Sequence, residues 1–216
     1  MKLSLIAVFI GFLVGVWFAE TPAFAREVME DFSQTSPGLF PRIFKTYPFQ
    51  RGKAQRVYRV YEENGNRFLH ASDGEETGSS VFRYFVWDAK KAPQFSWRWR
   101  ALKLPQKAES QDCACGLFLV FGGYGGKTIK YIWSTTLPVG RVIQNNPSNY
   151  FTVVVDSGPK SVGTWVTHEV NVMEDYKKFF KSDLKKNLSG IGLLTDGDDT
   201  HSPSECDYDD FAIGGG

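Results

Sequence analysis

The sequence has few of the residues that build metal centres and catalytic sites. It contains only three histidines and three cysteines among its 216 residues. Cys113 and Cys115 form a Cys-x-Cys pair and His201 stands alone, with no second Cys-x-x-Cys or His pair to complete a zinc site. There is no Gly-x-Ser-x-Gly motif, and no serine is an obvious partner for a histidine. The sequence therefore gives no support for a zinc centre or for a serine-hydrolase triad.

A strong charge excess of either sign is also absent. The chain has 25 Lys and Arg against 24 Asp and Glu, which gives a formal net charge of +1. Proteins that bind nucleic acids rely on an excess of basic residues to meet the phosphates. We therefore expect no nucleic acid among the partners of this protein.

Long hydrophobic runs are confined to the first 25 residues. Lys2 precedes an apolar run from Leu3 to Ala19, and Ala23-Phe24-Ala25 has the small-x-small pattern of a cleavage site. This pattern predicts a signal peptide at residues 1–25 and export to the periplasm or the medium. An uncleaved membrane anchor is the alternative, although a span needs roughly 20 apolar residues. No later run is long enough, so we expect no membrane span once the signal peptide is removed.

The remaining chain is rich in aromatic residues and in short strand patterns. Aromatics make up 15% of the sequence, which favours a sheet-rich protein. Phe95, Trp97 and Trp99 alternate with polar residues, and Asn64-Gly65 is a strong hairpin turn. We expect strands at Gln55–Glu62, Arg67–Ala71, Ser80–Trp87, Phe95–Ala101, Gly116–Phe121, Thr128–Trp133, Tyr150–Asp156, Thr164–Val170, Gly190–Thr195 and Asp209–Ile213.

One segment has the pattern of a helix. Asn171 can cap a helix over Val172–Lys181, with Glu174 three residues later in a capping-box arrangement. Many short strands with frequent turn signals and one short helix predict an all-β fold, a β-sandwich or jelly roll. We expect residues 26–216 to form a single domain of this kind.

Several motifs, in a fixed order, resemble those of a known family. The sequence is similar to the bacterial exported domain-of-unknown-function family 3047 over nearly all of residues 26–216. That family has no established activity, so the resemblance implies that the proteins are related but implies no biochemical activity. The three cysteines are a departure from its pattern. The motifs that carry the resemblance include Asp31-Phe-Ser33, Phe95-Ser-Trp-Arg-Trp99, Lys130-Tyr-Ile-Trp133, Gly163-Thr-Trp165, Leu194-Thr-Asp-Gly-Asp-Asp-Thr200 and Tyr208-Asp-Asp-Phe211.

A weaker resemblance concerns architecture. An Asp-Phe pair near residue 31 and the final Tyr208-Asp-Asp-Phe211 stretch resemble those of galactose-binding-like jelly rolls, which include many carbohydrate-binding modules. The resemblance implies that the first and last strands meet and share a structural calcium. Fold alone does not fix function.

An acidic loop supports the same idea, because calcium prefers oxygen ligands. Seven carboxylates lie between Asp196 and Asp210. We predict a calcium site that uses Asp210 with Asp31 or Glu30, and we include Asp196 and Asp198 as candidate ligands. A solvated acidic loop is the alternative, and the spacing does not fit an EF-hand.

The closing strand gives that prediction its physical reason. By strict alternation, Phe211 shares a face with Asp209, while Asp210 points the opposite way. If Phe211 enters the core, Asp209 faces inward and Asp210 outward. One of the two then needs a compensating partner, which a calcium ion shared with Glu30-Asp31 would supply.

The cysteines suggest a disulfide in an exported protein. Cys113 and Cys115 are expected to share one face of a strand, with their Cα atoms about 6.5 Å apart, at the limit for a bridge. We therefore expect Cys206 to pair with either Cys113 or Cys115. Three unpaired thiols are the alternative.

Candidate ligand-binding residues complete the interpretation. Trp133, Trp165 and Tyr124 could be stacking platforms for sugar rings, or could belong to the core. Arg98 and Arg100 share a face and could line a surface for an anionic ligand, or could be solvated. We predict a non-catalytic binding module for glycan or another envelope component. A β-sandwich glycosidase or lyase, or a purely structural envelope protein, are the alternatives.

Overall fold

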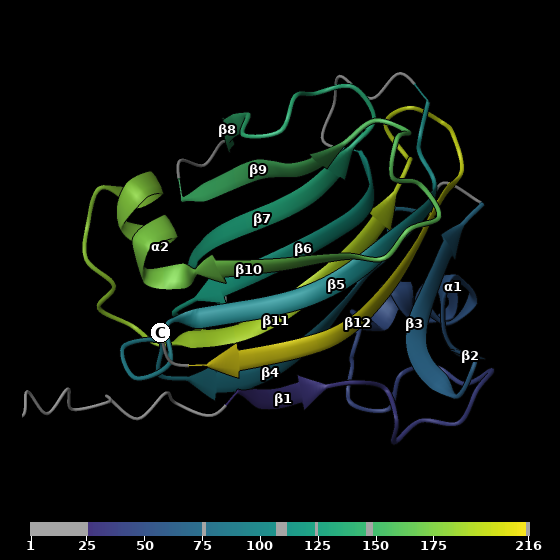
Figure 1. The fold of residues 1–216 in the computed structure, drawn as a ribbon, viewed down its shortest axis with the longest axis horizontal. Coiled ribbons are helices and arrows are strands. Elements are labelled where there is room, and N and C mark those ends of the chain that lie inside the picture. The colour runs from purple at the N-terminus through teal and green to yellow at the C-terminus, as the bar shows by residue number, and fades with distance from the viewer. Residues whose placement is uncertain (1–25, 75–76, 107–111, 124, 146–148, 215–216) are drawn as a thin grey trace, which may run out of the picture.

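The fold is a sandwich of two six-stranded sheets, which confirms the all-β prediction (Figure 1). The computed structural model describes residues 26–214 apart from 75–76, 107–111, 124 and 146–148. The predicted signal peptide and Tyr124 lie outside the described residues. Within the described ranges, no helix combines the length and apolar character needed to cross a membrane.

Sheet A has the strand order β10-β5-β12-β3-β2, and β1 pairs with the far end of β12. The first and last strands therefore meet, as the jelly-roll resemblance implied. Its strands are β1 (Glu27–Glu30), β2 (Tyr58–Glu63), β3 (Asn66–Asp73), β5 (Gln94–Lys103), β10 (Val166–Asn171) and β12 (Ser204–Gly214).

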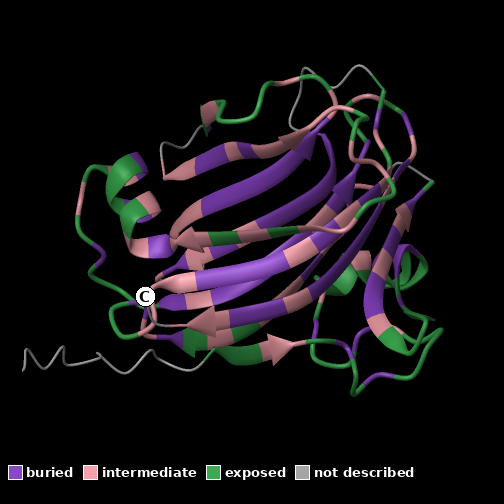
Figure 2. Cartoon of the chain, in the orientation of Figure 1, coloured by how far each residue is buried: buried purple, intermediate pink, exposed green. Residues whose placement is uncertain are grey.

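Sheet B has the order β4-β11-β6-β7-β9-β8. Its strands are β4 (Ser80–Trp87), β6 (Cys113–Phe121), β7 (Lys127–Ser134), β8 (Val142–Asn145), β9 (Tyr150–Ser157) and β11 (Leu188–Asp196). The core fills the space between the sheets, where Figure 2 shows the strands largely buried. Its largest members come from both sheets, with Trp97 and Trp99 on β5 against Tyr131 and Trp133 on β7.

The predicted helix is present as α2 (Val172–Phe180). The Asn171 side chain accepts hydrogen bonds from the amides of Met173 at 3.1 Å and Glu174 at 3.2 Å. Lys181 ends the helix in the left-handed conformation. The local capping signals were therefore sufficient to locate this element.

A second helical segment was not predicted. A 3-10 turn (Pro48–Gln50) leads into α1 (Arg51–Val57), so the strand expected from Gln55 begins only at Tyr58. Ala54 and Val57, three residues apart, are buried where α1 lies against β2 and β3. A helix places such residues on one face, and tertiary packing here overrides the strand propensity of the segment.

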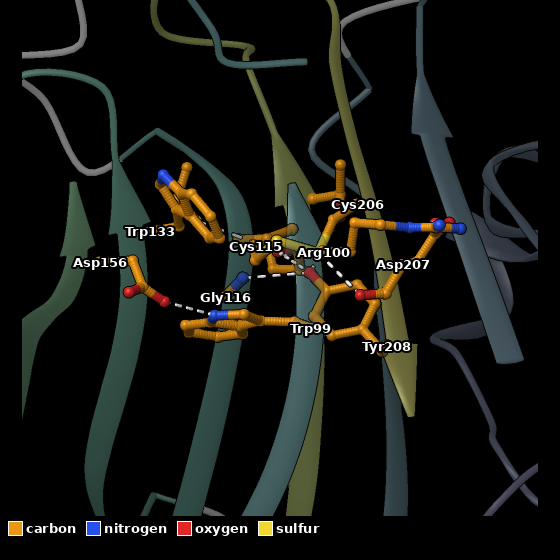
Figure 3. Close-up of a disulfide and its surroundings, with 12 residues drawn as sticks. Trp99, Arg100, Cys115, Gly116, Trp133, Asp156, Cys206, Asp207 and Tyr208 are labelled. Atoms are coloured by element: carbon orange, nitrogen blue, oxygen red, sulfur yellow. Dashed lines mark hydrogen bonds and ion pairs between the residues drawn. A yellow bond between two sulfur atoms is a disulfide. The ribbon is translucent and has the colours of Figure 1, made fainter. Parts of the chain in front are cut away.

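A disulfide joins the two sheets through the core (Figure 3). It connects Cys115 on β6 to Cys206 on β12, whose Cα atoms are 5.4 Å apart. Cys206 thus pairs with one of the two partners left open by the sequence, and Cys113 is a buried free thiol. The expectation that Cys113 and Cys115 share a face is wrong, because the pairing with β11 shifts register between Leu194 and Asp196.

A second bulge, in β12, changes the face of the sheet to which the following side chains point. Asp209 pairs with Arg98 and Ala212 with Ser96, so two residues of β12 oppose one of β5. Asp210 occupies the bulge with a φ of 53°. The expected alternation is therefore wrong here: Phe211 enters the core, while Asp209 lies on the outer face of sheet A beside Arg98.

Candidate functional site

The outer face of sheet B carries a trough whose floor is the backbone of β11. Gly192 pairs with Phe82 on β4 and with Phe118 on β6, and Gly190 pairs in the same way with Tyr84 and Val120. Side chains opposite one another on neighbouring strands point to the same side of a sheet. A strand that presents only glycines there leaves a channel walled by its two neighbours.

Aromatic rings form most of these walls. Tyr47 lies 5.2 Å from Phe82, and Phe82 lies 4.9 Å from Tyr84, between ring centroids. On the other wall, Phe118 and Tyr150 lie 6.2 Å apart. We call this channel, with Tyr47, Phe82, Tyr84, Phe118, Tyr150 and the floor of Gly190 and Gly192, the aromatic trough.

Neutral polar groups gather at one end of the trough. Asn149 donates from Nδ2 to the carbonyls of Gly125 and Gly126, both at 3.2 Å. The Ser189 hydroxyl accepts from the amide of Gly123 at 2.9 Å. These bonds hold the glycine-rich turn after β6 against the end of the channel.

The trough encloses about 390 Å³, and its exposed lining is largely apolar. Among its described lining residues there is no carboxylate and no lysine. The one charged side chain is Arg83, which donates to the carbonyl of Met29. An arrangement of flat apolar rings with neutral hydrogen-bonding groups fits an uncharged ligand with flat apolar faces.

The predicted stacking residues lie elsewhere. Trp133 is only 1% exposed and belongs to the core, so the prediction of a stacking platform there is wrong. Its indole nitrogen donates to the carbonyl of Gly158 at 3.1 Å. The sequence could not show that Trp133 is interior, because both sides of β7 are buried and alternation therefore gives no signal.

Trp165, Arg98 and Arg100 do come together, on the outer face of sheet A. The Trp165 ring centre lies 4.6 Å from the guanidinium carbon of Arg98 and 4.9 Å from that of Arg100. Arg98 contacts Asp209 at 2.6 Å, and Arg100 contacts Asp207 at 2.7 Å (the latter pair is drawn in Figure 3). Carboxylates of the protein itself thus compensate both guanidinium groups.

The environment of Asp209 also removes the reason given for a shared calcium. Burial raises the pKa of the Asp209 carboxyl, while hydrogen bonds from Asn66 and Arg98 act in the opposite direction. The partner that compensates this buried carboxylate is therefore Arg98 and not a cation shared by β1 and β12.

The candidate metal ligands divide between two places. At the β1 end, Glu30 accepts from the amide of Phe32 at 2.7 Å. Asp31 and Asp210 border one hollow, and Asp210 also contacts Arg98 at 2.9 Å.

Asp196 and Asp198 lie at the end of β11 instead, together with Asp112. One oxygen from each of these three carboxylates lies within 4.8 Å of the others. Burial, followed by the neighbouring Asp198, raises the pKa of Asp196 to about 7. Within the described residues, this group supplies carboxylate oxygens of the kind that a hard cation prefers.

The aromatic trough was missed in the sequence, although two signals pointed to it. Phe82 and Tyr84 stand two residues apart on one strand, and Gly190 and Gly192 do the same on another. Glycine inside a strand marks a place where something else approaches the backbone closely. The pairing of β4 with β11 places the two aromatic residues beside the two glycines, and this pairing is not visible in the sequence.

No curated protein matches this chain. Among solved structures, a family 11 carbohydrate-binding module from Clostridium thermocellum, in complex with a mixed-linked tetrasaccharide, is similar at 11% identity. That match covers 88% of this chain and 95% of the module, with a TM-score of 0.45.

An endoglucanase 3 of family GH12 from Trichoderma harzianum is similar at 10% identity over 73% of this chain and 81% of the enzyme, with a TM-score of 0.38. At TM-scores below 0.5, these two likenesses do not bear on the function of the chain.

A family model gives a firmer relationship. Residues 43–212 match the model of DUF3047, which is described as a protein of unknown function. This range takes in most of the chain and all strands of both sheets except β1 and the last residues of β12. The chain therefore belongs to the DUF3047 family.

Proposed function

We propose that this protein binds carbohydrate in the aromatic trough and does not cleave it. The observation that supports this most directly is the pairing of two floor glycines with aromatic residues on both neighbouring strands. Sugar rings present flat C–H faces, which pack well against aromatic rings. The neutral polar groups around Asn149 and Ser189 are suited to hydroxyl groups at the edge of such a ring.

The dimensions of the trough support a ligand of a few sugar units. Its volume of about 390 Å³ lies within the range of roughly 300–1,000 Å³ that small-molecule sites occupy.

The absence of carboxylates among the described lining residues supports binding over cleavage. Glycosidases use two carboxyl groups, roughly 5–9.5 Å apart, on either side of the scissile bond. The acidic group at Asp196 lies four residues beyond Gly192 on β11, about 13 Å further along the strand. Asp207, one of the acidic residues of the closing strand, lies on sheet A and pairs with Arg100.

The binding experiment compares the two faces of the sandwich. A glycan-array screen identifies a ligand, and calorimetric titration measures its dissociation constant. Tyr84→Ala and Phe118→Ala should each weaken binding about tenfold, the loss that corresponds to roughly 1.4 kcal/mol. Trp165→Ala, on the opposite face, is the matched control. A loss confined to the Trp165 variant would move the site to sheet A and contradict the proposal.

We further propose that the protein acts outside the cytoplasm, on an envelope or extracellular glycan. The support is the signal-peptide pattern of residues 1–25. The intact mass of the exported protein should correspond to a chain that begins at Arg26. A mass that includes residues 1–25 would indicate a membrane-anchored form instead.

A further inference from the structure

One long stretch of the chain carries positive charge with no negative charge beside it in sequence. Residues 32–61 contain no Asp or Glu, and without their basic residues the acidic residues of the chain outnumber the basic ones. All of these basic residues are exposed. They are Arg42, Lys45, Arg51, Lys53, Arg56 and Arg59.

The same stretch exposes large apolar side chains. Phe49 is 80% exposed and Leu39 is 58% exposed, and Ile43 and Tyr47 are also on the surface. Phe49 stacks on Tyr47, with ring centroids 5.7 Å apart. In Figure 2 this region, around α1 and the segment that precedes it, is largely coloured as exposed. Exposed apolar residues set among cations are typical of surfaces that sit at a membrane interface.

A hollow in this surface brings three of the cations together. Arg42, Lys45 and Arg51 border a depression of about 490 Å³, and no acidic residue is among its described neighbours. None of the three takes part in an ion pair within the described part of the chain. Their charge is thus available to an external anion, in contrast to that of Arg98 and Arg100.

We infer that this surface docks the protein onto a bilayer that contains anionic phospholipid. We call it the basic face, formed by Leu39, Arg42, Ile43, Lys45, Phe49 and Arg51. The cations meet lipid phosphates, and the hollow receives a phosphate headgroup. Phe49, Leu39 and Ile43 enter the boundary between headgroups and acyl chains. A soluble polyanion would neutralise the cations but would offer no apolar layer to these three side chains.

The basic face adjoins the aromatic trough. Tyr47 contributes to the trough wall and stacks on Phe49, and Lys45 pairs with Phe82 beside it. Docking through the basic face would therefore hold one end of the trough close to the lipid surface.

The test is co-sedimentation of the exported protein with lipid vesicles. Intact mass first establishes that residues 1–25 are absent, because that segment would itself bind lipid. Vesicles of phosphatidylcholine are compared with vesicles that also contain phosphatidylglycerol. We expect binding to the anionic vesicles alone, and its loss as salt screens the charges.

The triple variant R42Q/K45Q/R51Q should reduce partition onto anionic vesicles about a hundredfold. The matched control, K160Q/K178Q/K185Q, removes the same charge from exposed sites elsewhere and should retain most of the binding. Phe49→Ser should weaken binding while leaving the charge unchanged. Thermal melting of each variant verifies folding, as these side chains are on the surface.

Equal loss in the two triple variants would show that only net charge matters, and would overturn the inference. Equal binding to neutral vesicles would overturn it as well. Binding to dextran sulfate without binding to vesicles would assign the surface to a soluble polyanion instead of lipid. Titration of the same variants with carbohydrate measures binding in the trough separately. A failure of lipid binding can therefore be told apart from a failure of the function proposed for the trough.

Discussion

Arg98 on β5 donates to Asp209 on β12 at 2.6 Å, on the outer face of sheet A. The Asp209 side chain is completely buried, whereas Arg98 is partly exposed and lies against the ring of Trp165. The pair exists because the bulge at Asp210 turns Asp209 away from the core. Strict alternation along β12 would have placed the Asp209 carboxylate among the aromatic side chains of the core. The bulge places it beside the Arg98 guanidinium group instead.

Removal of Arg98 should therefore destabilise the protein. Arg98→Met leaves a buried carboxylate without its cation, and we expect the free energy of unfolding to fall by about 3 kcal/mol. Asp209→Asn, which keeps a hydrogen-bonding group at the same place, should cost less. Urea unfolding of the two variants measures the difference. A cost of less than about 1 kcal/mol for Arg98→Met would mean that the pair contributes no more than a surface contact.

The disulfide gives a second prediction. Cys115 and Cys206 are 91 residues apart in sequence, and a link across so long a loop removes much of the entropy of the unfolded chain. Reduction should lower the free energy of unfolding by roughly 2–5 kcal/mol. Peptide mapping without reductant should find this link and a free Cys113. Cys113→Ala is the control, because it should leave the effect of reductant unchanged; a variant that no longer responds to reductant would contradict the assignment.

Asp196 makes stability depend on pH. Its pKa is raised to about 7 by burial and then by Asp198, whereas an aspartate in an unfolded chain titrates at about 3.9. Between these values the folded protein holds a proton that the unfolded chain has released. The free energy of unfolding should therefore fall as the pH rises from about 4 to 7.

Asp196→Asn removes this titration and should raise the free energy of unfolding at pH 8 by about 2 kcal/mol. Urea unfolding at pH 5 and pH 8 measures the change. Asp199→Asn, at an exposed neighbour, is the control and should keep the wild-type slope. If both variants keep that slope, Asp196 is not the group responsible.

Calcium binding, predicted from the acidic loop, is tested at the same group. Asp112, Asp196 and Asp198 would bind the ion with oxygen ligands. A ligand that binds only the folded state at about 100 times its dissociation constant stabilises it by roughly 2.7 kcal/mol. Excess calcium should therefore raise the wild-type melting midpoint relative to chelator, and should not change that of Asp198→Asn. Identical wild-type curves in calcium and chelator would leave the loop as a solvated acidic surface.

Local signals in the sequence were enough for much of the fold. The Asn64-Gly65 turn joins β2 to β3, and the cap at Asn171 begins α2. Alternation identified the inward face of β5, because Trp97 and Trp99 are separated by an arginine. These features depend on residues close together in the chain, and so a sequence displays them directly.

The functional surface depends on features that a sequence does not display. Strands such as β4, β6 and β7 carry apolar residues on both faces, so alternation cannot tell which face is interior. This is why the sequence leaves Trp133 open between a stacking platform and the core, and why it does not single out Phe118. Bulges near Cys113 and at Asp210 reverse the alternation within a strand. The pairing of β11 between β4 and β6 joins segments far apart in sequence.

Gly192 provides the most direct test of the trough as a carbohydrate site. A methyl group added there would lie 3.4 Å from the ring of Phe118, which is ordinary van der Waals contact. Gly192→Ala should therefore fold normally and melt at or slightly above the wild-type midpoint. The new methyl group would occupy the floor between Phe82 and Phe118 while leaving every aromatic ring in place.

Calorimetric titration of Gly192→Ala with a glycan that binds the wild-type protein is the decisive measurement. We predict a loss of affinity of at least about tenfold, which corresponds to roughly 1.4 kcal/mol, together with a melting midpoint no lower than that of the wild-type protein. An affinity equal to that of the wild-type protein, in a variant that is fully folded, would show that carbohydrate does not bind in the trough.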